Sequence, residues 1–538
     1  MSRHDGALAV LAAVAGAVAI LFTWQPGLAS LYDDSVFYLM MAQAFSPFEQ
    51  ASAAVLAAAP FDTYPPFLPL LLALGGGAFD WRIAHAIVAA CFGASVFLLG
   101  MHARGLTQSA TMGFAAALVY ALMPGAWLNV KGILSEFPYM ALSFGALVVH
   151  ARAGGAAPSP RRAVVLGVLL AALLLTRTVG IALMVAVAAC EARRYWRDRD
   201  ARRLARLGWI FGVPLACVAL WIVLRPSSGQ DAYADFGARM AEGAAREGAA
   251  WVLSIAGTNA RALLDAWLNA LLIFWGEWWK PGFLLACLLG IAGIGATAWR
   301  ALHFEADGLY CVAFLAIVLA WPFPGQMYRL ALPVIPLVMV NVLWAWQRLL
   351  VRLRPESATR APWAAALPLA LCAPAVLFYI VERARAPEES GAPGRKADIA
   401  EFYRIPSGPA AAANAGAQIE VFRDLERIGA TTPQSARVLW YAPAYVALLG
   451  KRHGARLERP VDAADLASQA RDSHADFIYL ADLHPRDSAR RLGHPLDPAA
   501  YATSIARVVW SRRSPSGEMR SELLEFDHEK IRYNAKSP

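Results

Sequence analysis

Residues 82–101 read Arg82-Ile-Ala-His-Ala-Ile-Val-Ala-Ala-Cys-Phe-Gly-Ala-Ser-Val-Phe-Leu-Leu-Gly-Met101, and only Arg82 carries a full charge. A helix needs roughly 20 such residues to cross the hydrocarbon core of a bilayer. The whole chain is similarly apolar, since 58% of its residues are hydrophobic and only 17% are charged, against roughly a quarter charged in soluble domains. Comparable stretches predict about eleven membrane spans, at 6–24, 82–101, 109–123, 133–150, 163–175, 179–190, 207–224, 281–299, 308–321, 328–346 and 363–382. The sequence therefore predicts a mainly α fold, a polytopic bundle of transmembrane helices.

The arginines lie in alternate connections between these stretches, with seven between Arg193 and Arg206 and none in residues 25–65. Connections rich in Lys and Arg stay on the cytoplasmic side of a membrane. We therefore expect an integral protein of a bacterial cytoplasmic (inner) membrane, with the N-terminus inside and residues 25–65, 225–265 and 383 onward outside. The net charge of +9 then reports topology, and we expect membrane lipids as surroundings and no nucleic acid as a partner.

The C-terminal part differs in composition from the apolar region. Residues 386–396 are rich in Pro, Gly and charge, as in a linker, and ordinary globular composition follows. Short apolar runs at 437–441, 476–480 and 506–510 alternate with helical patterns at 415–429 and 462–472. We expect a transmembrane domain at 1–382, a linker at 383–413 and a small extracytoplasmic α/β domain at 414–538.

Polar residues on the predicted outer side are candidates for a site. Each also has a structural explanation: Asp33 or Asp34 could cap a helix, the Tyr64-Pro-Pro turn could be interfacial, and arginines could contact headgroups. The Trp-rich run ending at Lys280 is typical of an interfacial belt. A carboxylate or arginine at the edge of the lipid is nevertheless costly unless it is paired or hydrated. The candidates are Asp33, Asp34, Tyr38, Tyr64, Lys131, Glu136, Arg177, Lys280, Tyr328 and Arg329.

The order of these motifs resembles the GT-C superfamily of membrane glycosyltransferases, which includes protein O-mannosyltransferases and lipid A aminoarabinose transferases. The matching series is Asp33-Asp-x-x-x-Tyr38, then Tyr64-Pro-Pro-x-x-Pro-Leu-Leu, then Ser135-Glu, then Thr176-Arg-x-x-Gly, then Tyr328-Arg-x-x-Leu-Pro-x-x-Pro. The resemblance covers about residues 1–350 and rests on the ordered set, because each motif alone is weak. The chain departs from it at Asp34, where many relatives have Glu, and at Phe67, where glycine is common.

The resemblance implies transfer of a sugar from a polyprenyl-phosphate donor to an extracytoplasmic lipid, glycan or protein. A phosphodiester leaving group needs no acid, so one carboxylate suffices as the general base for the acceptor hydroxyl. Single displacement inverts the anomeric carbon. We expect Asp33 or Asp34 to be this base, and Arg177 and Arg329, with Lys131 and Lys280, to bind the phosphate. Glu136 could pair with one of these cations or hold the acceptor, and Tyr38, Tyr64 and Tyr328 would line the substrate site.

No ligand cluster typical of zinc or calcium occurs in the predicted outer connections, and the six cysteines lie inside apolar runs. The sequence therefore does not identify a definite cofactor. A divalent cation, Mg²⁺ or Mn²⁺, could bind at Asp33 and Asp34. Two other interpretations remain open. A non-catalytic assembly or lipid-binding subunit would keep this fold without turnover. A transporter would place charges at mid-membrane and repeat its halves, which this sequence does not do.

Overall fold

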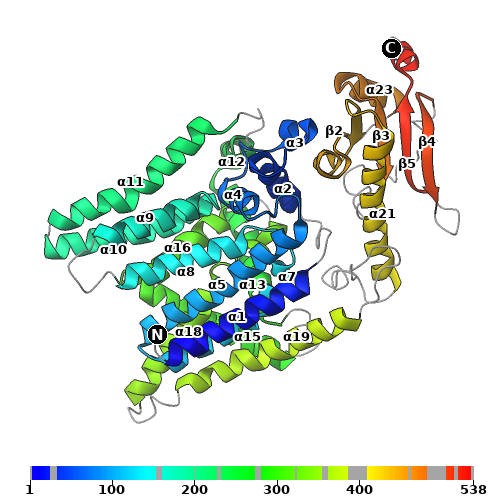
Figure 1. Ribbon diagram of the computed structural model, residues 1–538. Helices are drawn as coiled ribbons and strands as arrows, with labels where there is room; N and C mark the ends of the chain where they lie inside the picture. Colours follow the sequence, from blue (N-terminus) through cyan, green and yellow to red (C-terminus); the bar gives the residue numbers. More distant parts are fainter. Residues whose placement is uncertain are drawn as a thin grey trace. The chain divides into compact units, whose positions relative to one another are not determined.

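A computed structural model describes residues 3–24, 33–152, 160–199, 201–226, 232–272, 280–321, 324–353, 361–385, 409–458, 462–481, 504–513 and 519–534. The chain packs as two compact units, both visible in Figure 1. The first comprises Met1–Ser30 and Phe61–Glu382, and the second comprises Leu31–Pro60 and Arg383–Pro538. The second unit therefore combines the C-terminal part with a segment that follows the first helix.

The described part of the first unit is helical. Its helices are α1 (Arg3–Thr23), α4 (Phe67–Leu74), α5 (Trp81–Thr107), α6 (Ala110–Ala121), α7 (Pro124–Val130), α8 (Glu136–Arg152), α9 (Pro160–Leu174), α10 (Ile181–Asp198), α11 (Ala201–Leu224), α12 (Ala232–Glu247), α13 (Ala249–Leu272), α15 (Lys280–Leu302), α16 (Ala306–Leu319), α17 (Met327–Leu330), α18 (Ile335–Leu353) and α19 (Ala366–Arg385), with 3₁₀ turns η1 (Thr178–Gly180) and η2 (Pro324–Gln326). Every predicted span overlaps at least one of these helices.

Four of the described helices, within α1, α5, α11 and α15, are long and apolar enough to cross a membrane by themselves. The pair α6 and α7, bent by 55°, makes a fifth if it counts as one span. The larger predicted number of spans therefore stays a prediction, while the helical membrane character is evident. Exposed aliphatic side chains such as Leu215, Leu220 and Ile291 cover these helices and suit contact with lipid.

The centre of the first unit is packed from small and aromatic residues. Gly93 of α5 lies so close to α1 that an added Cβ would come within 2.8 Å of the Ala12 carbonyl oxygen. The Phe92 ring meets the rings of Trp127 and Phe137 edge-on, at centroid distances of 5.7 and 5.2 Å. Such edge-to-face contacts add to the burial of large apolar surfaces. They hold α7 and the first turn of α8 against α5, which fixes where Glu136 begins its helix.

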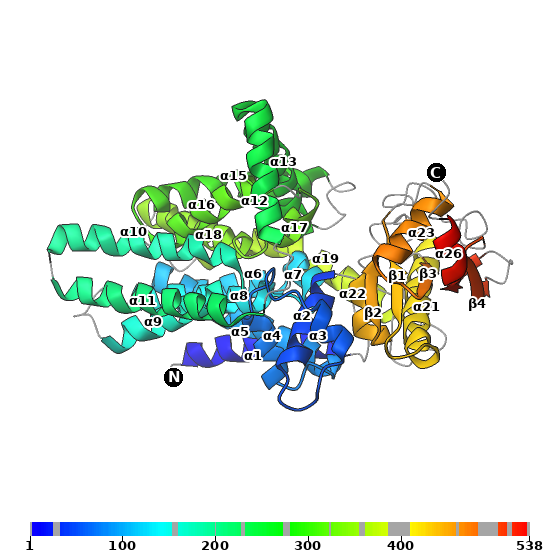
Figure 2. The ribbon, with the colours of Figure 1, turned by 90° about the horizontal axis from the view of Figure 1, so that it is seen from above.

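Residues 225–265, expected simply as an outer connection, contain α12 and most of α13. Figure 2 shows α13 running across the direction of α10 and α11. Asn259 of α13 donates a 2.8 Å hydrogen bond to the Leu319 carbonyl at the end of α16, and Trp267 donates one of 2.8 Å to the Ala286 carbonyl of α15. Arg261 interrupts the apolar pattern of this helix, and among the described helices α13 is not one of those apolar enough to cross a membrane by themselves.

The second unit is built on a five-stranded sheet with the order β2-β1-β3-β5-β4. Strands β1, β2 and β3 are parallel, whereas β5 pairs antiparallel with both β3 and β4. The three stretches predicted as strands form β1, β3 and β4. The elements are α2 (Asp33–Phe45), α3 (Ala53–Ala58), α21 (Pro409–Thr431), β1 (Arg437–Trp440), α22 (Pro443–Tyr445), the π-helical turn η4 (Val446–Gly450), β2 (His453–Arg456), α23 (Ala463–Asp472), β3 (Phe477–Ala481), β4 (Ala506–Arg513), β5 (Met519–Phe526) and α26 (His528–Asn534).

Helices cover both faces of this sheet. On one face, Leu466 of α23 and Ile531 of α26 join the core cluster that includes Ile478 and Leu524 of the strands. On the other face, Asp424 of α21 is 5% exposed. It accepts hydrogen bonds from the Tyr479 hydroxyl at 2.9 Å, the Ser521 hydroxyl at 2.6 Å and Arg512 at 2.6 Å. Burial raises the pKa of Tyr479 well above its usual value, so its hydroxyl stays a donor.

Helices α2 and α3 belong to this second unit. They pack against α22, η4 and β2, although α2 lies far from these elements in sequence. The buried face of α2 includes Val36, Leu39 and Met40. The predicted domain bounds stay a prediction; by contacts, Leu31–Pro60, which lie inside the predicted domain 1–382, group with Arg383–Pro538. Most of the predicted linker, at 386–408, lies outside the described residues, and α21 begins within its last part.

Candidate functional site

Glu136, Arg177 and Arg329 form a buried ionic cluster at the end of the bundle where α8 begins, and we call this the Glu136 cluster. The Glu136 Oε1 atom accepts a 2.6 Å hydrogen bond from Arg177 Nη1 and lies 3.0 Å from Arg329 Nε. The Glu136 side chain is 1% exposed, and those of Arg177 and Arg329 are 13% and 11% exposed. The three side chains carry two positive charges and one negative charge. Guanidinium groups can make charge-assisted hydrogen bonds to more than one anionic oxygen.

Local structure positions each member of the cluster. Glu136 is the first residue of α8, where the positive end of the helix dipole favours a carboxylate. Arg177 sits in the break between α9 and η1, in extended backbone conformation. Arg329 lies in the short helix α17. Three interruptions of helices, far apart in sequence, thus bring their side chains together.

The second oxygen of Glu136 differs from the first. Oε2 is buried, and it accepts no hydrogen bond from any residue that the structure describes. A buried carboxylate oxygen without a donor costs free energy comparable to a lost hydrogen bond. Among described residues, Glu136 thus shares one oxygen between two arginines and keeps its other oxygen available to a hydroxyl or N–H donor.

The turn containing Tyr64 lies beside this cluster. The Phe67 amide, two residues past Pro65, donates a 2.8 Å hydrogen bond to the Leu175 carbonyl, which is two residues before Arg177. The Tyr64 side chain itself is half-buried. The structure thus brings the proline turn next to the break that carries Arg177.

Sequence reasoning missed Arg225, which ties the same turn to α11. Its Nη1 donates a 3.1 Å hydrogen bond to the Asp62 carbonyl, and its Nε lies 3.6 Å from the Asp62 carboxylate. The signal was present, because Arg225 is a single cation directly after the apolar run 207–224.

The remaining candidates of the first unit occupy different environments. Lys131 is 2% exposed, at the end of α7. Tyr328 precedes Arg329 in α17 and is half-buried. Lys280 is exposed at the first residue of α15. In the described part of the chain, the ion pairs of Glu136 are with Arg177 and Arg329, and neither lysine pairs with it.

Asp33 and Asp34 are the first two residues of α2, in the second unit. Asp34 is half-buried and Tyr38, one turn later, is 5% exposed. Both acids therefore lie within the first helical turn, where a carboxylate is favoured by the helix dipole. Their approach to Arg177 and Arg329 in the first unit stays a prediction.

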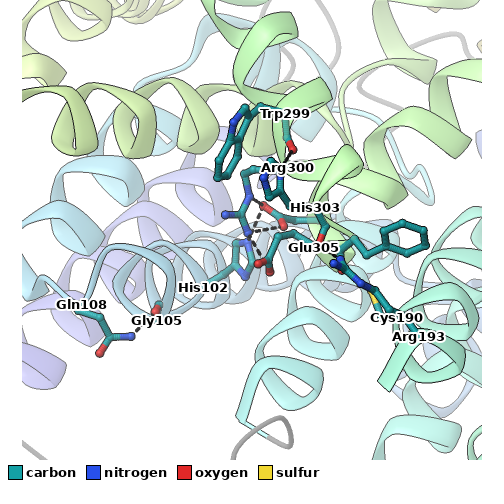
Figure 3. A network of polar contacts seen from close by, with 11 residues as sticks. His102, Gly105, Gln108, Cys190, Arg193, Trp299, Arg300, His303 and Glu305 are labelled. Carbon is teal, nitrogen blue, oxygen red and sulfur yellow. Dashed lines mark hydrogen bonds and ion pairs between the residues drawn. The ribbon is translucent and has the colours of Figure 1, made fainter. Parts of the chain in front are cut away.

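A second buried ionic cluster lies at the opposite end of the bundle, around the turn between α15 and α16. Arg300 donates hydrogen bonds of 2.8 and 2.6 Å to the two oxygens of Asp307, and it lies over the Trp344 ring at 4.9 Å. Figure 3 shows Arg300 directed toward His102 and Glu305. Both Asp307 oxygens are occupied here, unlike those of Glu136. This cluster therefore stabilises the turn between α15 and α16.

Within the described ranges, no group of three or more His, Cys, Asp or Glu residues could hold a metal ion. A divalent cation at Asp33 and Asp34 therefore stays a prediction, as does its identity as Mg²⁺ or Mn²⁺.

No family model and no curated protein matches the sequence. Solved structures do match. The Archaeoglobus fulgidus oligosaccharyltransferase, solved with Zn and sulfate, is 14% identical with a TM-score of 0.55, over 96% of this chain and 72% of that one. AglB, an oligosaccharyltransferase of the same archaeon solved with an inhibitory peptide and a dolichol-phosphate, is 13% identical with a TM-score of 0.53, over 97% and 74%.

ArnT from Cupriavidus metallidurans, in the apo state, is 16% identical with a TM-score of 0.51, and the match covers 98% of this chain and 99% of that one. At such low identity the likeness concerns the fold, and it extends over both units of the chain. The chain therefore shares its fold with these oligosaccharyltransferase and ArnT structures, in keeping with the resemblance read from the ordered motifs.

Proposed function

We propose that this chain is a membrane glycosyltransferase that moves a sugar from a polyprenyl-phosphate donor to an extracytoplasmic acceptor, with inversion at the anomeric carbon. The observation that carries the proposal is the Glu136 cluster, two arginines held together by one carboxylate at the end of a bundle with the GT-C fold. The presence of a dolichol-phosphate in the AglB structure supports a phosphate-bearing lipid as the ligand.

Arg177 and Arg329 bind the phosphate of the donor. The guanidinium group makes charge-assisted hydrogen bonds to phosphate oxygens, and it keeps its charge when it is buried. Glu136 holds both arginines in place through Oε1, so little side-chain entropy is lost when the donor binds. Lys131 and Lys280 would add positive charge along the path of the phosphate, and Tyr64 and Tyr328 would line it.

Asp33 or Asp34 acts as the general base. The acceptor oxygen attacks the anomeric carbon, and the carboxylate takes the hydroxyl proton. The bond between the anomeric carbon and the phosphate oxygen breaks, and the polyprenyl phosphate leaves with the electron pair. The other aspartate, with Tyr38 one turn later, orients the acceptor or a divalent cation. The Oε2 atom of Glu136, which accepts no hydrogen bond within the described residues, receives one from the acceptor.

The test is transfer of radiolabelled sugar from polyprenyl-phosphate donors to envelope material. Wild type is compared with Asp33→Asn, Asp34→Asn and the double variant, after equal membrane insertion has been verified. Loss of transfer in one single variant identifies the base. Unchanged transfer in the double variant contradicts the catalytic role and favours a non-catalytic assembly or lipid-binding subunit.

A second comparison tests the phosphate site. Arg177→Gln should raise the donor KM by about 10- to 100-fold, because a hydrogen bond to a charged group contributes about 1.5–3 kcal/mol. The matched control is Arg104→Gln, since Arg104 also pairs with an acid, Asp5, but at the opposite end of the bundle. An equal rise in KM for both variants would mean that Arg177 does not contact the donor.

A further inference from the structure

The ends of α9, α10 and α11 form an arginine-rich surface at the end of the bundle opposite the Glu136 cluster. Gly167 lies about two turns into α9, and an added Cβ there would come within 2.6 Å of the Trp209 carbonyl oxygen, about two turns into α11. The two helices therefore pack in close contact and begin at a similar level. Figure 1 shows α9, α10 and α11 side by side. Two helix N-termini and the C-terminus of α10 thus gather at one place.

This surface carries a high density of positive charge. We call it the arginine face, and among described side chains it comprises Arg152, Arg161, Arg162, Arg193, Arg194, Arg197 and Arg199. Most of these side chains are exposed, and Arg161 and Arg162 lie in the first turn of α9. The first N–H groups of a helix point outward and favour anions. Arginines and helix N-termini therefore act in the same sense here.

A buried polar group lies beneath the arginine face. The Glu191 carboxylate, 1% exposed, accepts a 2.7 Å hydrogen bond from Arg194 and lies 3.7 Å from the His150 ring. Neither ring nitrogen of His150 hydrogen-bonds to a described residue, and the side chain is 4% exposed. Glu191 thus fixes the Arg194 side chain, and His150 keeps a ring N–H that can donate to a further acceptor.

Apolar and aromatic side chains continue from the arginine face along the same helices. Trp196 is 66% exposed and Trp209 is 53% exposed, while Val165 and Val168 of α9 are 49% and 52% exposed. Exposed tryptophans are typical of the boundary between headgroups and hydrocarbon. The aliphatic side chains provide a surface for acyl chains next to the cations. A soluble anion would use the arginines but not this apolar surface.

We propose that the arginine face binds the headgroups of anionic phospholipids in the adjoining leaflet, with the acyl chains lying along α9 and α11. The phosphate accepts hydrogen bonds from the arginines and from the first N–H groups of α9 and α11. The arginines of this face therefore bind lipid in addition to setting the orientation of the chain in the membrane. The same surface ties this part of the bundle to anionic lipid, independently of any sugar transfer at the Glu136 cluster.

The experiment uses the full chain in detergent, titrated with phosphatidylglycerol or phosphatidylcholine and followed by native mass spectrometry. The test variant is the triple substitution Arg161→Gln, Arg162→Gln and Arg197→Gln. Wild type should prefer phosphatidylglycerol, and the variant should bind it about a hundredfold more weakly, given the typical contribution of each surface arginine. The preference should also weaken as salt rises.

The matched control removes three exposed arginines elsewhere in the first unit, by Arg82→Gln, Arg246→Gln and Arg352→Gln. It should keep the preference of wild type. Equal loss in both triple variants would reduce the effect to net charge and overturn the proposal. Equal affinity of wild type for the two lipids, or equally tight binding of soluble glycerol phosphate, would overturn it too.

Discussion

Replacing Glu136 by Gln should destabilise the chain, and a phosphate-bearing lipid should restore much of that stability. Arg177 and Arg329 both reach Glu136 Oε1, at 2.6 and 3.0 Å. Without the carboxylate charge, Arg177 and Arg329 lose the buried anionic oxygen that they share. Breaking a buried ion pair from one side typically costs about 3–5 kcal/mol. We expect a loss of that size in the free energy of unfolding.

The assay is denaturant unfolding of the purified chain in detergent, with and without a short-chain polyprenyl phosphate. A ligand that binds only the native state at a hundred times its Kd stabilises it by about 2.7 kcal/mol. Because the anion takes the place of the lost carboxylate, stabilisation should be larger for Glu136→Gln than for wild type. The control is Asp307→Asn, a buried carboxylate held by Arg300 at the opposite end, which should be destabilised without this rescue. Equal stabilisation of all three proteins would refute a phosphate site at the Glu136 cluster.

Three further substitutions test other parts of the structure. Gly167→Ala should lower the free energy of unfolding by about 1–3 kcal/mol, because the added Cβ pushes α9 away from Trp209. Gly212→Ala is the control, since Gly212 faces open space, and it should leave stability unchanged. Equal thermal stability of the two variants would contradict the close approach of α9 and α11. Asp424→Asn should lower the stability of the second unit by about 2–4 kcal/mol, because a buried acceptor of three hydrogen bonds loses its charge. Denaturant titration measures this loss, and an unchanged unfolding midpoint would contradict it. Burial raises the pKa of Glu522 above its ordinary value of 4.5, so the folded state binds the proton more tightly and loses stability as pH rises through that window. Glu522→Gln should therefore unfold at a higher temperature than wild type at pH 7 and at nearly the same temperature at pH 4, and a stabilisation independent of pH would argue against a charge effect.

The helical stretches could be predicted because apolar length is a local property of the sequence. The helix α13 was not predicted, since Arg261 and Asp265 divide its apolar run and its contacts with α15 and α16 are long-range. Its neighbours, rather than its own composition, decide where it lies. Local pattern similarly could not reveal that Arg225 ties the Asp62 turn to α11.

The sequence marked Glu136, Arg177 and Arg329 individually as costly charges beside apolar stretches. Sequence alone left open whether Glu136 pairs with a cation. The structure shows that one oxygen serves both Arg177 and Arg329, a geometry that depends on three separate helix breaks. The sequence also could not predict that Asp33 and Asp34 group with the C-terminal unit. The packing of α2 on α22 joins segments that no local pattern connects.

That grouping bears on how the protein is made. Leu31–Pro60 leaves the ribosome early, but the rest of its unit begins only at Arg383. At ordinary elongation rates of about 5–20 residues per second, the interval is on the order of tens of seconds. Throughout that time α2 lacks the contacts that it makes with α22 and η4 in the finished chain. A nascent or truncated chain therefore presents this segment to chaperones and proteases, and quality control can sense an incomplete C-terminus through a helix synthesised near the start.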